Sequence, residues 1–207
     1  MLKTQQYPQI VQPSGSNMCG AYSLAAALHT LGGFDSFKSV VLNKLDLRSL
    51  RFTKRSIHIR QQQSLDVIAK LIYEVTGIIP ETAQHTFANV SNGLNSIVSM
   101  AYVAEQFGFQ TSLVVKDMDT YKTLSEQYPQ ELKLSKAQNL KVEIGFSHQS
   151  SSTVLLPTIV LSTGEKHCVA LSELGLFDPI DGSVNPVTSL SACGNWLGVA
   201  LKVETFA

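Results

Sequence analysis

The residues best suited to chemistry are a cysteine near the start of the chain and a histidine near its end. Cys19 follows a Gly/Ser-containing loop and opens an Ala- and Leu-rich stretch, 21–31, which predicts a helix that ends at Gly32. Free N–H groups and the helix dipole favour an anion at a helix N-terminus, so a thiol ionises more easily there. Since the thiolate is the nucleophilic form, Cys19 is a candidate nucleophile. The alternative is a small buried apolar residue, as free cysteines often are.

His167 stands at the start of an apolar alternating run, 166–171, just after a turn. This pattern predicts a strand whose first side chains project from the sheet edge toward the helix of Cys19. An imidazole there can take the proton of the thiol and later protonate the leaving group. Cys168 should point to the opposite face and pack. His148, in a Ser-rich loop, is the alternative base.

A carboxylate follows His167 at the end of the next predicted strand. Asp178 precedes Pro179, which cannot continue a strand ladder. A carboxylate at this place can accept a hydrogen bond from the histidine ring N–H and so fix the orientation of the ring. Asp181 lies in the same turn, and either acid could instead cap the turn. Asp178 is therefore the candidate orienting residue, with Asp181 as the alternative.

These residues together resemble the papain-like cysteine peptidases, and most nearly the bacteriocin-leader (double-glycine) peptidase-like branch. The likeness covers about 12–32 and 155–203. Its parts, in chain order, are Gln12, Asn17-Met18-Cys19-Gly20 with a small-residue helix, His167 on a strand, Asp178-Pro179 and the Trp196-Leu197-Gly198 strand. The resemblance implies that Cys19 is the nucleophile, His167 the base and Asp178 the orienting residue. It also assigns Gln12 to the oxyanion hole, where Asn17 is the alternative donor.

The remaining patterns predict the elements that position this site. Helices are expected over about 36–45, 64–75, 95–107 and 119–127, and strands over 110–115, 153–161, 166–171, 176–178 and 196–203. Helices first and antiparallel sheet last indicate an α+β fold. We expect a single papain-like domain over 1–207, with a helical part at about 12–108 and a sheet part at about 109–207.

Composition limits the class of protein. With 207 residues, of which 44% are hydrophobic, the chain can bury a core. Its 16 basic and 16 acidic residues balance, so no overall positive potential attracts nucleic acid or an anionic membrane. The three cysteines form neither a CxxC pair nor a Cys/His ligand pair, which argues against a disulfide framework and a zinc site. No phosphate-binding glycine loop and no membrane-length apolar run are apparent, so we expect no cofactor and no membrane span.

A basic cluster begins at the end of the helix expected over about 36–45 and continues through a segment expected to be irregular. It runs from Lys44 to Arg60 and lacks interleaved aromatic residues at a stacking spacing, which disfavours nucleic acid. The cluster is either a docking surface for an acidic partner or simply solvated.

The predicted reaction is attack of Cys19 on a peptide or amide carbonyl, followed by hydrolysis of the thioester. Capture of the acyl group by an amine or thiol would instead make the protein an acyl transferase, deamidase or transglutaminase. A catalytically silent peptide-binding module is the alternative from another class. The expected partner is a peptide or protein substrate. The sequence fits either a reducing cytoplasm or a secreted or delivered protein without a visible signal peptide, and leaves the oligomeric state open.

Overall fold

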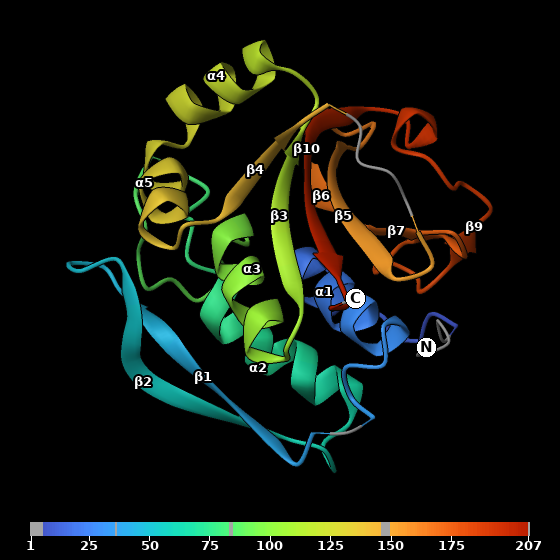
Figure 1. Ribbon diagram of the computed structural model, residues 1–207, viewed down its shortest axis with the longest axis horizontal. Coiled ribbons are helices and arrows are strands. Elements are labelled where there is room, and N and C mark those ends of the chain that lie inside the picture. The colour runs from blue at the N-terminus through green and yellow to red at the C-terminus, as the bar shows by residue number, and fades with distance from the viewer. Residues whose placement is uncertain (1–5, 36, 83–84, 146–149, 207) are drawn as a thin grey trace.

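The computed structural model describes residues 6–35, 37–82, 85–145 and 150–206. It has a mixed α+β fold in which helices cover one side of a large sheet (Figure 1). The helices are α1 (Cys19–Thr30), α2 (Leu65–Thr76), α3 (Ile97–Gln106), α4 (Met118–Gln127) and α5 (Pro129–Ala137). The strands are β1 (Ser39–Asp46), β2 (Arg51–Arg60), β3 (Gln110–Val115), β4 (Lys141–Ile144), β5 (Thr153–Val160), β6 (Lys166–Cys168), β7 (Ala170–Ser172), β8 (Gly175–Phe177), β9 (Val184–Asn185) and β10 (Trp196–Glu204). The predicted α+β class is confirmed.

The large sheet brings distant segments together. Its strand order is β4-β3-β10-β5-β7-β8-β9, and β6 pairs with β5 outside this path. All pairs are antiparallel except β3 with β4, so the expectation of a purely antiparallel sheet is wrong at this edge. The helices α4 and α5 connect these two strands and supply the long crossover that a parallel pair needs.

Local signals fix three of the helix starts. Ser64, Ser96 and Asp117 each cap a helix by accepting a hydrogen bond from a backbone N–H three residues later. The predicted helices at 64–75, 95–107 and 119–127 are therefore confirmed as α2, α3 and α4. By contrast, Met18 at the start of α1 makes no side-chain cap, and the first turn contains no acidic residue.

The helix expected at 36–45 is wrong, and so is the irregular basic segment after it. Both belong to a hairpin in which β1 and β2 pair antiparallel, from Ser39 opposite Arg60 to Asp46 opposite Arg51. Inward side chains such as Val40 and Leu42 alternate with outward ones, and this two-residue period is that of a strand. Phe52 stacks on Tyr102 of α3 at 3.8 Å between ring centroids. The hairpin is thus fixed by packing on helices far away in sequence.

The first helix is the centre of the fold. Residues 20–28 of α1 are all buried, and the helix contacts α2, α3 and the strands β5, β6 and β7. A helix that is apolar on every side must be enclosed on every side. In the described part of the chain, no helix combines the length and hydropathy needed to cross a bilayer. That residues 1–207 make one domain stays a prediction.

Candidate active site

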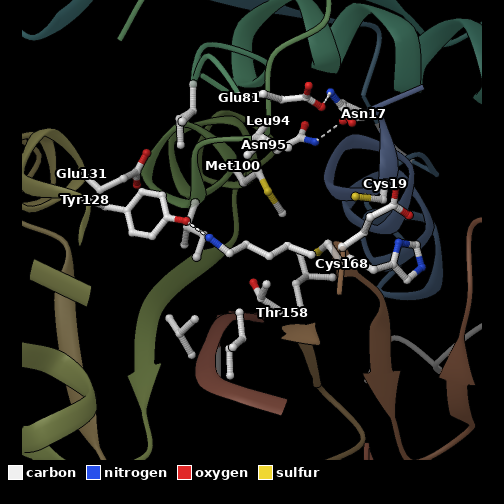
Figure 2. Close-up of a pocket in the computed structure, with 18 of the residues that line it drawn as sticks. Asn17, Cys19, Glu81, Leu94, Asn95, Met100, Tyr128, Glu131, Thr158 and Cys168 are labelled. Carbon is white, nitrogen blue, oxygen red and sulfur yellow. Dashed lines mark hydrogen bonds between the residues drawn. The ribbon is translucent and has the colours of Figure 1, made fainter. Parts of the chain in front are cut away.

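Cys19 lies at the first position of α1, where it lines a large cleft between the helices and the sheet. Its side chain is half-buried, and its sulfur points into the cleft (Figure 2). Because Met18 provides no side-chain cap, backbone N–H groups of the first turn remain available to an anion. The local structure therefore favours negative charge on or beside the Cys19 sulfur.

His167 is held between Cys19 and Asp178. Its Nε2 lies 2.8 Å from Asp178 Oδ1, which leaves Nδ1 as the ring nitrogen available to Cys19, and Cys19 is close enough to raise the pKa of His167. Burial of His167 by itself lowers its pKa, but the hydrogen bonds and negative charges of Asp178 and Cys19 raise the pKa to about 9. At neutral pH the ring is thus mostly a cation, which is the state that stabilises a thiolate.

Asp178 is ionised more easily than its burial alone would allow, which suits it to bind the His167 ring. Burial opposes its ionisation, but hydrogen bonds from His167 and from the Ile180 N–H hold its pKa below the usual range. Asp181, the alternative acid, instead accepts a hydrogen bond from the Ser183 N–H at 2.9 Å. The structure therefore brings Asp178 and not Asp181 to His167. His148, the alternative base, lies outside the described residues.

The two candidate oxyanion donors differ in their surroundings. Gln12 lines the cleft, and its backbone N–H donates to the Pro179 carbonyl at 2.8 Å, beside Asp178. Its Nε2 donates one hydrogen to the Ser16 carbonyl at 3.3 Å, and its buried Oε1 has no partner among the described residues. The side-chain amide of Asn17 is bound to Glu81 at 2.7 Å and to the Asn92 carbonyl at 3.0 Å. Both hydrogens of Asn17 are thus used, whereas Gln12 keeps one.

Asn95 is a residue that the sequence did not single out, and it holds the loop before Cys19. Its Nδ2 donates to the Asn17 carbonyl at 2.7 Å, and its Oδ1 accepts from the Thr76 hydroxyl at 2.7 Å (Figure 2). A Cβ added at Gly20 would lie 2.7 Å from the Asn95 Cβ and 3.0 Å from the Met100 sulfur. Asn95 and Gly20 therefore set the position of the first turn of α1. The only sequence signal is the place of Asn95 before the capping Ser96.

Replacing Gly20 with alanine is expected to destabilise the protein. Alanine is favoured over glycine within a helix by about 1 kcal/mol. Overpacking a close contact costs roughly 1–3 kcal/mol. This cost exceeds the gain in helix propensity, because the backbone at residue 20 and the Asn95 Cβ would have to move apart. The urea midpoint of unfolding should fall in the Gly20→Ala variant. A rise in the midpoint would mean that the contact with Asn95 is looser than described.

The cleft has a volume of about 940 Å³ and extends from Cys19 to α4 and α5. Most of its wall is apolar, with side chains such as Leu94, Ile97 and Leu156. Lys166, next to His167, reaches the Tyr128 hydroxyl at the far end and also lies 4.8 Å from the centre of that ring. The volume is at the upper end of that of ligand pockets, so the cleft can hold several groups of a substrate besides the scissile bond.

Glu131 supplies a buried carboxylate to the same wall. Burial raises its pKa to about 7, and hydrogen bonds from the Ser96 side chain and the Val98 N–H oppose this effect. The Val98 contact is 3.2 Å long and lies in the first turn of α3. A carboxylate at this position complements the helix dipole, so Glu131 connects α5 to the start of α3.

The other two cysteines differ from Cys19. Burial raises the pKa of Cys168 well above its usual value, and the nearby Cys19 charge adds to this effect. Burial also raises the pKa of Cys193 to about 11. Cys168 packs against the core as expected, but it also lines the cleft. Among the described residues, no three His, Cys, Asp or Glu side chains are placed to bind a metal ion together.

Comparison with known proteins identifies a family for the chain. A search of the curated proteins gives no match. Residues 11–185, which include Cys19, His167 and Asp178, match the family described as "Invasion plasmid antigen J, cysteine protease". This match covers more than half of the chain, so the chain belongs to this family of cysteine proteases and is a cysteine-dependent hydrolase.

Proposed function

We propose that this protein hydrolyses a peptide bond in a protein substrate through a thioester on Cys19. The observation that carries the proposal is the place of His167, which bonds Asp178 through Nε2 and is close enough to Cys19 for the thiol to raise its pKa. A thiol, an imidazole and a carboxylate in this order are the parts of a nucleophilic triad. The finer resemblance to double-glycine peptidases stays a prediction.

In the proposed reaction, the Cys19 thiolate attacks the carbonyl carbon while His167 carries the proton. The tetrahedral intermediate collapses with cleavage of the C–N bond, and His167 donates its proton to the leaving amine. A water molecule then attacks the thioester and gives its proton to His167, which releases the acid and restores Cys19. Asp178 keeps the imidazole ring in one orientation and stabilises its charge.

The oxyanion of the tetrahedral intermediate is assigned to the Cys19 N–H and to Gln12 Nε2. Both groups border the cleft, and Gln12 is fixed to the Asp178 loop through its backbone. Preorganised donors at this place stabilise charge that develops only in the transition state. The intramolecular bonds of Asn17 make it the weaker candidate.

The wall of the cleft indicates the kind of substrate. Its apolar side chains favour a peptide segment with apolar groups near the scissile bond, since burial of about 25 cal/mol per Å² of apolar surface adds to binding. The size of the cleft favours a segment of several residues over a single small amide.

The direct test is a digest of a proteome-derived peptide library with sequencing of the new N-termini. The protein should create new termini that share an apolar pattern, and the Cys19→Ala variant should create none. New termini that persist in Cys19→Ala would exclude Cys19 as the nucleophile. Binding of peptides by both proteins, without any cleavage, would favour the peptide-binding module.

Replacing Asp178 with asparagine is expected to change the pH dependence of the reaction. His167 must be protonated to release the amine, so the rate should fall as pH rises through its pKa of about 9. Loss of the Asp178 charge lowers that pKa, which moves the fall to lower pH. At pH 8 the rate should drop roughly tenfold or more, since an imidazole near its reference pKa of ~6.5 is mostly neutral there.

The matched control for this experiment is Asp181→Asn. Asp181 lies in the same turn, and an asparagine keeps the Oδ1 acceptor for the Ser183 N–H. Its pH–rate profile should equal that of the unmodified protein. Equal shifts in both variants would show that the turn, and not the contact between Asp178 and His167, sets the profile.

A further inference from the structure

The hairpin β1–β2 carries a charge that the neutral total conceals. Residues Lys38–Arg60 contain seven of the 16 Lys and Arg residues but one of the 16 acids, Asp46, which gives a formal charge of +6. The rest of the chain holds nine basic and 15 acidic residues, a formal charge of −6. The molecule is therefore strongly polarised, with its positive end at the hairpin.

The positive charge lies on the outward side of the hairpin. Inward residues such as Leu42 and Ile59 are buried, and the hairpin lies across α2 and α3, away from the large sheet (Figure 1). No residue of 38–60 is among the described residues that line the cleft of Cys19. This surface is thus separate from the proposed chemistry.

Besides Lys38, the cations of this hairpin that form no ion pair within the described residues are arginines. Lys44 pairs with Glu74 at 3.1 Å, and Lys54 lies 3.9 Å from Asp46. Arg48, Arg51, Arg55 and Arg60 are exposed, and in the described part of the chain none of them has a carboxylate within ion-pair distance. Arginine binds carboxylates with two parallel hydrogen bonds, which a lysine cannot do.

The hairpin also has a free strand edge. Within the described residues β2 pairs only with β1, so its outer backbone groups before Arg60 remain open to another strand. At Arg60 the backbone N–H already donates to Gln63 Oε1 at 2.7 Å. A bilayer offers no strand to pair with this edge. Nucleic acid is disfavoured because Phe52, the aromatic residue of β2, is buried against Tyr102.

We propose that the arginine surface, Arg48, Arg51, Arg55 and Arg60, together with the outer edge of β2, binds an acidic extended segment of another protein. Strand addition supplies main-chain hydrogen bonds, and the arginines select acidic side chains of the segment. The negative charge of the rest of the molecule repels the same segment elsewhere and so directs it to the hairpin. The proposal does not depend on the chemistry of Cys19.

Binding can be measured by fluorescence anisotropy with the full-length Cys19→Ala variant, which excludes cleavage. The probe is a labelled peptide of about ten residues, the length of β2, in which Glu alternates with Thr or Val. A second peptide has Gln in place of Glu. The acidic peptide should bind more tightly than the Gln peptide, and its affinity should fall in about 0.5 M salt, where charges are screened within a few Å.

Two variants of equal charge change locate the site. Arg51→Glu/Arg55→Glu should weaken binding of the acidic peptide by about tenfold or more, which corresponds to about 1.4 kcal/mol. Lys122→Glu/Lys133→Glu, on the exposed sides of α4 and α5, should bind as tightly as the parent. Arg51→Lys/Arg55→Lys should bind less tightly than the parent because it keeps the charge and loses the paired hydrogen bonds.

Three results would overturn the proposal. The first is that the acidic peptide does not bind at low salt. The second is that the two Glu variants weaken peptide binding equally. The third is that the protein binds vesicles with phosphatidylserine but does not bind the peptide. The last result would assign the hairpin to a membrane surface. Unchanged affinity for an acidic peptide that is N-methylated at alternate positions would remove the strand edge from the site. Peptide cleavage by the active protein is measured separately, so either proposal can fail alone.

Discussion

His167→Ala is expected to lower the rate of peptide cleavage by roughly 10³- to 10⁴-fold. The variant loses both the cation beside Cys19 and the acid that protonates the leaving amine, and general acid–base catalysis alone contributes about 10²- to 10⁴-fold. Cys19→Ala should abolish cleavage, because it removes the sulfur that attacks the carbonyl carbon. The rates can be compared on the best peptide from the library digest.

The same variant separates the role of His167 from that of a structural residue. Alkylation of each cysteine at pH 6, followed by peptide mass spectrometry, reports its thiolate. An ordinary thiol with a pKa of ~8.5 is only about 0.3% ionised at this pH, so rapid alkylation of Cys19 requires a stabilised thiolate. Cys168 and Cys193 should react slowly, since burial raises their pKa values.

Alkylation of Cys19 should therefore be fast in the unmodified protein and slow in His167→Ala. The matched control is His85→Ala, at an exposed histidine, which should leave the rate unchanged. Circular dichroism would check that both variants are folded, because His167 is only 4% exposed and its removal leaves a cavity. If Cys19 is as inert as Cys193, or indifferent to His167, the thiolate–imidazolium pair does not exist.

Where the fold depends on local signals, the sequence predicted it. Ser64 and Ser96 open α2 and α3 through their side-chain caps, and α2 ends at Gly77, whose φ of −79° other residues also adopt. The hairpin was missed because a register shift between Asn43 and Leu45 interrupts its alternating pattern, and because the contacts that favour it, such as Phe52 on Tyr102, join residues far apart in the chain. The β3–β4 pair was missed because β4 has only four residues.

In the site, too, the sequence predicted the residues that carry a motif and missed a residue that acts only through contacts in the folded chain. Residue types and order along the chain identified Cys19, His167 and Asp178 as candidates, and the structure brings these three together across 159 residues of sequence. Asn95, which fixes the loop before Cys19, carries no motif of its own. Its importance arises from two hydrogen bonds to segments on either side, and such contacts exist only after the chain has folded.

Gln12→Ala is expected to lower kcat by about 10²- to 10³-fold, the cost of one lost oxyanion donor. The rate of Cys19 alkylation should stay unchanged. Iodoacetamide is attacked at a saturated carbon, so alkylation forms no oxyanion and needs only the thiolate. This contrast distinguishes Gln12 from His167, whose removal should slow both reactions.

The matched control is Gln9→Ala, an exposed glutamine on the same segment, which should leave both rates unchanged. If Gln12→Ala slows alkylation as much as cleavage, the residue supports the position of Cys19 through its contacts with Ser16 and Pro179. If it slows neither, the oxyanion relies on backbone N–H groups at the start of α1, where the uncapped helix leaves them available. The pair of rates therefore assigns Gln12 to the transition state, to the local structure, or to neither.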